Sequence, residues 1–294
     1  MGKHSLKRLY ASSPRLHVDN GSKIVLMSDA HRGDGTQSDD IMQNKTIVSH
    51  ALAHYLNEGF TYIELGDGDD LWKNKKMSNI EKNHADIFAL LMMFKDNNKL
   101  HLVYGNHDFD KKTSGSMAPA KSLDGEFVPG FSYEESLVLS FGENRNMLLL
   151  HGHQVDWINY DLWPLSRFFV RHIWRPLQLL GVKNPFIPAE NTKKADRLDK
   201  LLMEWSESSG IAIAAGHTHR SMFPNPGGPL YFNDGCCVHP YGITAIEIER
   251  GQISLVRWLV ATRHDASLYV ARAVDQGSIN INRMFSKRTV SNGV

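Results

Sequence analysis

The amino-acid sequence predicts an α/β fold in which largely parallel strands alternate with helices. Three observations support this prediction. Short apolar runs bounded by polar residues recur between residues 23 and 104, amphipathic stretches with helical spacing separate them, and Asp, Asn or His follows each run. A chain of 294 residues that is 41% hydrophobic and 22% charged can bury a core of this kind without disulfides.

The first half of the chain alternates strands with helices. Strands are expected at residues 23–28, 61–65 and 100–104, where apolar and β-branched residues cluster. Helices are expected at 41–56 and 80–94, where apolar residues recur at helical spacing. This order is typical of βαβ units and therefore of a parallel sheet.

The second half adds a hairpin, an aromatic segment and further strands. Residues 110–131 are rich in Gly, Ser, Pro and Lys and are expected to form a loop. The remaining elements are expected at 136–141 and 146–150 (hairpin strands), 194–208 (a helix), and 211–215, 230–233, 242–249 and 253–259 (strands). Residues 260–294 become polar and are expected to form an irregular C-terminal tail. We expect one domain over residues 1–294.

Composition excludes several classes of protein. The 33 basic and 32 acidic residues leave a net charge of +1, so no overall field attracts nucleic acid. Cys236 and Cys237 are adjacent, so they cannot form a disulfide framework and are expected to be buried as small apolar residues. Residues 1–20 contain no apolar segment of the signal-peptide type, and no uncharged apolar run reaches about 18 residues. We therefore expect a cytoplasmic protein.

Side chains that bind metals follow five of the expected strands. They are Asp29 and His31, Asp67 and Asp70, Asn106 to Asp108, His151 and His153, and His217 and His219. One Asp or His after a strand usually forms a turn or a cap, but turn chemistry does not explain five strand ends. Because the carboxyl ends of parallel strands meet at one edge, these side chains should share one rim. Carboxylates and imidazoles are ligands of Mn, Fe, Zn and Co, so the pattern predicts a divalent-metal site.

The five segments also carry a resemblance. They read SDAH at 28–31, GDGDD at 66–70, GNHD at 105–108, HGH at 151–153 and GHTH at 216–219. In this order and spacing, from about residue 23 to 235, they resemble the calcineurin-like metallophosphoesterase superfamily. The resemblance implies a two-sheet α/β/β/α sandwich with a helical insert. It also implies two divalent metal ions at the sheet edge, with Mn favoured over Fe, Zn or Co.

The resemblance assigns ligands and a reaction to these positions. The implied ligands are Asp29, His31 and His219 for the first metal, Asn106, His151 and His217 for the second, and Asp67 bridging both. A hydroxide that bridges the metals would attack phosphorus and cleave a phosphate ester or pyrophosphate bond. His107 would protonate the leaving oxygen, and Asp70 would hold the other ring nitrogen. Asp108 either orients a neighbour or forms the turn.

Further residues are candidates for binding the substrate. Arg32 and Arg220 directly follow ligand-type histidines, so each is expected either to contact a substrate phosphate or to be a solvated rim charge. His153 is expected to face the substrate or to support a ligand.

Residues 157–188 form an insert between the HGH and GHTH segments and should therefore overhang the rim. The insert combines Trp, Tyr and Phe with Arg167, Arg171 and Arg175, which recur every four residues and so share one helix face. It is either a packed helix with a solvated basic face or a lid that binds an anionic, partly apolar substrate. Basic and aromatic residues together also suit peripheral contact with an anionic membrane.

The substrate stays open between several classes. The GHTHR segment and the insert are similar to those of UDP-2,3-diacylglucosamine pyrophosphatases, but that group typically has Arg where this chain has His107. This difference favours a general phosphoesterase acting on a phosphorylated small molecule or lipid. A protein Ser/Thr phosphatase, a nuclease or phosphodiesterase, and an inactive binding scaffold are the alternatives. The near-zero charge disfavours long nucleic acid, and the seven unaltered ligand positions disfavour the scaffold. The sequence carries no signal for an oligomeric state.

Overall fold

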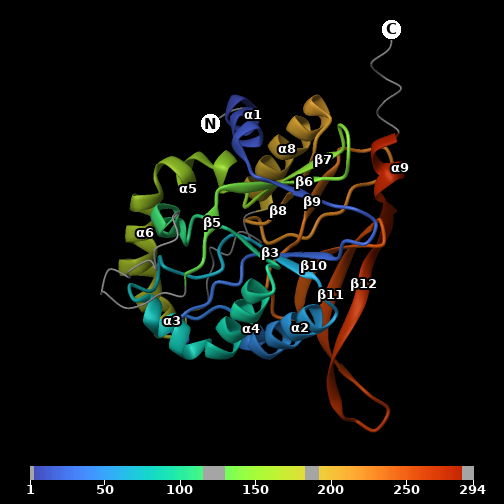
Figure 1. Cartoon of the computed structure of the whole chain (residues 1–294). Helices are drawn as coiled ribbons and strands as arrows, with labels where there is room; N and C mark the ends of the chain where they lie inside the picture. Colours follow the sequence, from blue (N-terminus) through green and yellow to red (C-terminus); the bar gives the residue numbers. More distant parts are fainter. Residues whose placement is uncertain (1–2, 115–129, 183–191, 287–294) are drawn as a thin grey trace.

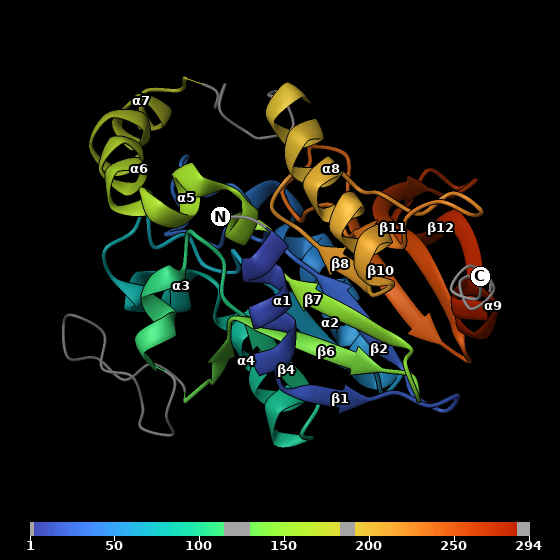
Figure 2. The ribbon, with the colours of Figure 1, turned by 90° about the horizontal axis from the view of Figure 1, so that it is seen from above.

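The computed structural model describes residues 3–114, 130–182 and 192–286, and in these ranges two β-sheets pack between layers of helices (Figures 1 and 2). This architecture confirms the α/β/β/α class that the sequence predicts. The hairpin predicted at 136–150 is also present, as an antiparallel pair of strands.

The larger sheet has seven strands in the order β12-β11-β10-β2-β3-β4-β5. Its strands are β2 (Ile24–Met27), β3 (Thr61–Leu65), β4 (Leu100–Val103), β5 (Tyr133–Glu134), β10 (Ile243–Glu249), β11 (Gln252–Thr262) and β12 (Leu268–Asn280). β2 to β5 run parallel, whereas β10, β11 and β12 pair antiparallel. The parallel strands β2, β3 and β4 therefore end at the same edge.

The smaller sheet has five strands in the order β1-β6-β7-β8-β9. Its strands are β1 (Arg15–His17), β6 (Ser136–Ser140), β7 (Asn146–Leu150), β8 (Ala212–Ala215) and β9 (Tyr231–Asn233). β7, β8 and β9 are parallel. The two sheets together thus supply all five strand ends that carry the ligand-type residues.

Alternating side chains hold the layers together. On β2, Ile24 and Leu26 face the core between the sheets, whereas Val25 and Met27 face the helices that cover the larger sheet. β7 and β8 alternate in the same way between the central core and a third cluster under the helices of the smaller sheet. Each of these strands is buried on both faces, so it appears in the sequence as a continuous apolar run.

Helices cover the outer face of each sheet. The helical elements outside the insert are α1 (Lys3–Ser12), η1 (Met42–Asn44), α2 (Lys45–Asn57), α3 (Met77–Asn83), α4 (Ala85–Asp96), η2 (Phe109–Ser114), η3 (His153–Val155), α8 (Thr192–Ser209) and α9 (Ile281–Ser286). α2 and α4 cover the larger sheet, and α1 and α8 cover the smaller one. The helix predicted at 80–94 is divided at His84, whose buried ring bonds Asp39 at 2.8 Å.

The predicted insert is helical where the structure describes it. It consists of α5 (Trp157–Asp161), α6 (Trp163–Phe169), the π-helical turn η4 (Val170–Trp174) and α7 (Arg175–Leu179). In Figure 2 it lies at the upper left, on the side of α3. Residues 183–188 of the predicted insert and most of the loop predicted at 110–131 fall outside the described residues.

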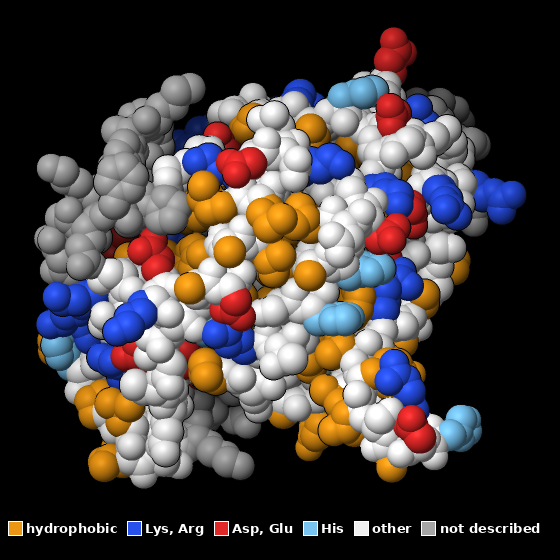
Figure 3. All heavy atoms as spheres, turned by 60° about the horizontal axis from the view of Figure 1, so that its bottom comes forward, with side chains coloured by type: hydrophobic (Ala, Val, Ile, Leu, Met, Phe, Trp, Pro, Cys, Tyr) orange, Lys and Arg blue, Asp and Glu red, His pale blue; other side chains and the backbone are white. Residues whose placement is uncertain are grey.

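The prediction of an irregular tail over residues 260–294 was wrong as far as residue 286. β11 continues to Thr262, β12 pairs with it along Leu268–Asn280, and α9 buries three apolar side chains. β12 is exposed on both faces over most of its length, so it lacks the alternation that marks a half-buried strand. Figure 3 shows the end of this hairpin projecting at the lower right, with hydrophobic and charged side chains side by side. Residues 287–294 lie outside the described part of the chain.

Two further expectations concern cysteines and membranes. Cys236 and Cys237 are buried free thiols, as predicted. In the ranges that the structure describes, no helix combines the length and the apolar character needed to cross a bilayer.

Candidate metal centre

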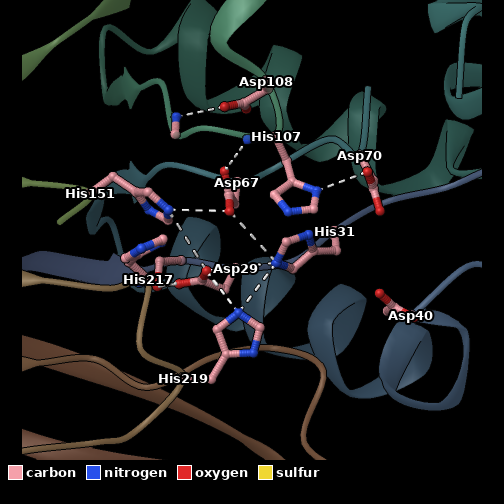
Figure 4. A network of polar contacts seen from close by, with 12 residues as sticks. Asp29, His31, Asp40, Asp67, Asp70, His107, Asp108, His151, His217 and His219 are labelled. Atoms are coloured by element: carbon pink, nitrogen blue, oxygen red, sulfur yellow. Dashed lines mark hydrogen bonds and ion pairs between the residues drawn. The ribbon is translucent and has the colours of Figure 1, made fainter. Parts of the chain in front are cut away.

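The residues that follow the five strands converge on one rim, as Figure 4 shows for most of them. Asp29 and His31 come from the end of β2, Asp67 and Asp70 from β3, Asn106 and His107 from β4, His151 from β7, and His217 and His219 from the segment after β8. The sequence separates these positions by as many as 190 residues, and the strand ends bring them together.

A first cluster consists of Asp29, His31 and His219. The His219 Nε2 atom lies 3.0 Å from Asp29 Oδ1 and 3.3 Å from His31 Nε2. The distance between His31 Nε2 and Asp29 Oδ1 is 3.7 Å. One cation could therefore touch all three side chains, the set that the resemblance implies for the first metal.

A second cluster consists of Asp67, His151 and His217, whose ligand atoms lie within 4.8 Å of one another. His151 Nε2 is 3.2 Å from Asp67 Oδ2, and the same oxygen is 3.8 Å from His31 Nε2 in the first cluster. Asp67 therefore lies between the two clusters. Asn106, the remaining implied ligand, is also buried, and it lines the cavity that opens above these clusters.

The buried donor atoms fit divalent cations. Asp29 Oδ1, Asn106 Oδ1 and His151 Nε2 are buried without a hydrogen-bond partner among the described residues. Burial alone would raise the pKa of Asp29, but the His219 and His151 imidazoles hold this pKa well below its usual value. Burial likewise opposes ionisation of Asp67, and His151 and His107 outweigh it and lower its pKa. The ionised carboxylates of Asp29 and Asp67 thus lie beside buried polar atoms that make no hydrogen bond in the described part of the chain. A bound divalent cation would offset the cost of burying these groups.

The backbone at this rim is strained. Nine non-glycine residues in the described ranges have positive φ angles of the left-handed type. Five of them belong to this site, with φ between 47° and 67°, and these are Asp29, His31, Asp67, His217 and His219. Such conformations cost about 1–3 kcal/mol each and are typical of functional sites. The sequence gives no direct signal of this strain.

Two glycines permit the close approach of the loops. A Cβ atom at Gly105 would lie 2.1 Å from Asp67 Oδ1, and one at Gly216 would lie 2.2 Å from Ser28 Oγ. Neither separation is compatible with a side chain, so these positions require glycine because loops from different strands meet there.

His107 and Asp70 form the pair that the sequence predicts. His107 Nδ1 lies 2.9 Å from Asp70 Oδ1, and the His107 backbone N–H donates to Asp67 Oδ1 at 2.8 Å. Burial alone would lower the pKa of His107, but the Asp70 and Asp67 carboxylates raise it. The ring is 18% exposed, and His107 lines the cavity above the two clusters.

A cavity of about 590 Å³ opens above the two clusters. Ligand-type residues line its polar end, and its apolar walls come from the insert, α8 and neighbouring loops, with Trp72, Phe169, Ile173, Trp174, Leu198 and Val238 among them. Lys194 also lines the cavity and pairs with Asp156 at 2.7 Å, and Asp156 lies 3.2 Å from His217 Nε2. The sequence pattern does not mark Lys194 as a site residue, because one lysine at the start of a helix is common.

Arg32 does not face the substrate, contrary to one of the two expectations for it. The residue is 1% exposed, and its guanidinium bonds Glu64 at 2.7 and 2.9 Å and Asp69 at 2.6 Å. Lys111 continues this buried network to Asp69 at 2.5 Å and to Asp108 at 3.2 Å. Asp108 also accepts from the Gly105 N–H at 2.6 Å, so it closes the turn as well as pairing with Lys111.

Arg220 and His153 also lie away from the cavity lining. Arg220 pairs with Asp196 at the surface, which agrees with a solvated rim charge. His153 is fully buried among aromatic and imidazole rings, including Tyr160 at 5.6 Å and His151 at 5.4 Å between ring centroids. Burial and the nearby His151 and His217 hold the pKa of His153 well below its usual value. It supports the site from behind and does not face the cavity.

All three arginines of the insert pair with groups in other parts of the protein. Arg167 pairs with Asp110 at 2.7 Å, and Arg175 pairs with Asp34 at 2.6 Å. Arg171 donates to the backbone carbonyls of two residues after β3. In this structure the three arginines therefore anchor the insert over the rim.

Comparisons with known proteins give one family match and several structural likenesses. The family model described as calcineurin-like phosphoesterase matches residues 22–221. No curated protein gives a significant sequence match. Similar solved structures include Vps29 of Chaetomium thermophilum, with a TM-score of 0.42, 9% identity and coverage of 88% of this chain and 96% of that chain. A cold-active protein-tyrosine phosphatase of a psychrophilic Shewanella species has a TM-score of 0.35 and 14% identity, covering 86% of this chain and 81% of that chain.

Proposed function

The chain belongs to the calcineurin-like phosphoesterase family, and we propose that it is a metal-dependent hydrolase of phosphate ester or pyrophosphate bonds. The observation that carries the proposal is the meeting of buried carboxylate, amide and imidazole atoms from five strand ends at one end of an open cavity. Such a donor set is suited to divalent cations and poorly suited to any role in packing.

Two divalent ions, with Mn²⁺ favoured, would be held at the two clusters. The proposed ligands are Asp29, His31 and His219 for one ion, Asn106, His151 and His217 for the other, and Asp67 for both. The spacing of Asp67 supports its shared role, because Oδ2 approaches His31 and His151 while Oδ1 accepts the His107 N–H. Bound there, the ions would bind phosphate oxygens and lower the pKa of the attacking water.

His107 would donate the proton that the leaving oxygen needs. Asp70 accepts from Nδ1 and fixes the tautomer, which leaves Nε2 to carry the transferable proton toward the cavity. The Asp70 and Asp67 carboxylates raise the pKa of His107, which favours the protonated ring. A general acid of this kind contributes about 10²–10⁴-fold to the rate.

The proposal is tested by combining an activity panel with metal analysis. The full chain with Mn²⁺ should hydrolyse a phosphomonoester, a bis-aryl phosphodiester or a nucleotide-sugar lipid. Asp67→Ala should lose both ions and lower kcat by roughly 10³-fold or more, whereas Asp196→Ala, which changes an exposed carboxylate, should retain both. Two ions retained in Asp67→Ala would exclude the shared ligand. A metal-free, inactive wild-type protein would exclude the function.

A finer proposal concerns the substrate, for which we favour a phosphate group attached to an apolar moiety. The cavity walls support this class, because Phe169 and Ile173 line the cavity and are 51% and 50% exposed. Burying such side chains against acyl or aromatic groups is favourable. The UDP-2,3-diacylglucosamine pyrophosphatases are one candidate group, although His107 differs from their usual Arg. Faster hydrolysis of an acylated substrate than of its deacylated analogue would support this class, and equal rates would exclude it.

The insert also supports peripheral contact with an anionic membrane. Leu165, Phe168 and Leu180 of the insert are exposed by 53%, 54% and 81%, and Arg167, next to Phe168 in the sequence, is partly exposed while it pairs with Asp110. Apolar side chains beside cations favour an anionic bilayer surface. Leu165→Ser with Phe168→Ser should weaken sedimentation with phosphatidylglycerol vesicles at least about five-fold. A matched pair, Tyr241→Ser with Val260→Ser, changes exposed residues elsewhere and should not. Equal binding by all three proteins would exclude the contact.

A further inference from the structure

We infer that Trp72 is a positioning residue for His107, and that Arg171 of the insert holds Trp72 in place. The inference rests on the proposed function, in which His107 is the proton donor. It links the docking of the insert to the orientation of that donor through contacts between described residues.

The segment Asp70–Trp72 contacts His107 in three different ways. Asp70 Oδ1 lies 2.9 Å from His107 Nδ1. The Leu71 N–H donates to the His107 carbonyl at 3.2 Å. The Trp72 indole stacks on the imidazole, with ring centroids 4.2 Å apart and planes inclined by 22°. The segment Asp70–Trp72 therefore restrains His107 at three places: the Nδ1 edge of its ring, its backbone carbonyl and one face of its ring.

The indole supplies a restraint that Asp70 cannot. A hydrogen bond at Nδ1 fixes one corner of the imidazole but allows the ring to tilt about that bond, which would move Nε2. Trp72 is only 4% exposed, so its ring is confined and blocks this tilt from one face. The His31 ring meets His107 edge-on, with centroids 4.6 Å apart. Nε2 is therefore held in one direction before any substrate binds.

Arg171, a residue of the insert, holds the segment Asp70–Trp72 by its backbone. Its Nε donates to the Trp72 carbonyl at 2.9 Å, and its Nη2 donates to the Leu71 carbonyl at 2.5 Å. A planar guanidinium can hold two neighbouring carbonyls at once, which a lysine ammonium does less well. The other two arginines on this helix face, Arg167 and Arg175, bind carboxylates on separate loops. Arg171 therefore differs from them in acting on the segment that contacts His107.

Leaving-group dependence distinguishes orientation of the donor from general packing. p-Nitrophenolate leaves readily without a proton, whereas an alkoxide needs one. Trp72→Ala should lower kcat for an alkyl phosphate about ten-fold more than for p-nitrophenyl phosphate, with metal content retained. Trp72→Phe, which keeps a stacking ring, should restore most of the difference. Arg171→Ala should show the same preference, and Arg175→Ala should affect both substrates equally. Equal losses for both substrates in Trp72→Ala would overturn the inference.

A second measurement does not depend on activity. The stacked indole shields the His107 ring protons, so their NMR resonances should lie upfield in the Zn²⁺-loaded full chain, assigned by their loss in His107→Gln. Trp72→Ala should move them downfield, and Arg171→Ala should move them part of the way. No movement in Arg171→Ala would overturn the link to the insert. Correct NMR shifts in a wild-type protein that hydrolyses no phosphate compound would instead count against the proposed function.

Discussion

At the scale of single residues, backbone contacts fix the side chains of the proposed metal site. The Asp29 N–H donates to the Gly66 carbonyl at 3.1 Å, and the His31 N–H donates to the Asp67 carbonyl at 2.9 Å. The His217 N–H donates to Asp29 Oδ2 at 2.9 Å. These bonds stabilise left-handed conformations that would otherwise be unfavourable, so the ligand atoms are held close together in advance.

Gly105 offers a direct test of this packing. In Gly105→Ala the new methyl group would meet Asp67 Oδ1 at 2.1 Å and the Asp67 backbone nitrogen at 2.5 Å, so the two loops must separate. We expect destabilisation of roughly 1–3 kcal/mol and weaker metal binding, measured by denaturant unfolding and isothermal titration calorimetry. Gly21→Ala is the control, because the nearest atom there is 3.5 Å away. Unchanged metal affinity in Gly105→Ala would contradict the close approach.

The same scale shows what sequence can and cannot reveal about the site. The seven proposed ligands and the His107–Asp70 pair were predictable, because each follows a recognisable strand. The arginines were not, because their partners are distant in sequence and only the fold brings them close. Arg32 is 32 residues from Glu64, and Arg175 is 141 residues from Asp34. The position of an arginine beside a proposed ligand in the sequence therefore does not predict which carboxylate or phosphate its side chain binds.

At the scale of elements, strands buried on both faces were predicted well and exposed ones were not. β3 matches its predicted range, and β2 and β4 differ from theirs by a residue at one or both ends, because apolar runs mark them. β12 is held by pairing with β11 and contributes little to the core, so its sequence pattern carries no such mark. The sequence pattern also did not predict how the insert is anchored, because the anchoring depends on contacts with segments after β2, β3 and β4.

The anchoring of the insert leads to a prediction for Arg175→Ala. The ion pair with Asp34 is partly exposed, so its loss should cost no more than about 1 kcal/mol in global stability. The insert itself should open more often, because one of its contacts with the body is gone. We expect faster amide hydrogen exchange across residues 157–182 and unchanged exchange in β2 and β3, measured by mass spectrometry. Arg257→Ala removes a similar exposed pair far from the insert and serves as the control. Unchanged exchange in the insert would show that the pair does not anchor it.

At the scale of the whole molecule, the site makes stability depend on pH when no metal is bound. Burial alone would lower the pKa of His151, but Asp67 and Asp29 raise it to about 9, above its ordinary value of 6.5, and neighbouring carboxylates raise the pKa values of His107 and His219 as well. The folded state therefore binds this proton more tightly than the unfolded state does. The resulting stabilisation is complete below pH 6.5 and is lost as the pH rises through about 9. The lowered pKa values of His153 and His217 change stability only below their ordinary value, so they do not offset this loss.

We therefore expect the chelator-treated protein to lose stability on the order of 1–3 kcal/mol between pH 6.5 and pH 9. A bound divalent ion replaces the proton at His151, so the loaded protein should show a smaller decline, and metal affinity should rise over the same range. Thermal unfolding with and without chelator, together with proton release measured by calorimetry in two buffers, separates these effects. His151→Gln should reduce the pH dependence of the metal-free protein, and His107 and His219, whose pKa values are also raised, should account for the remainder. The three proteins to compare are the metal-loaded, the chelator-treated and the His151→Gln protein. If their stability changed with pH to the same extent, Asp67 and Asp29 would not hold a proton at His151. A bound cation would then not be needed to offset the charge of these carboxylates.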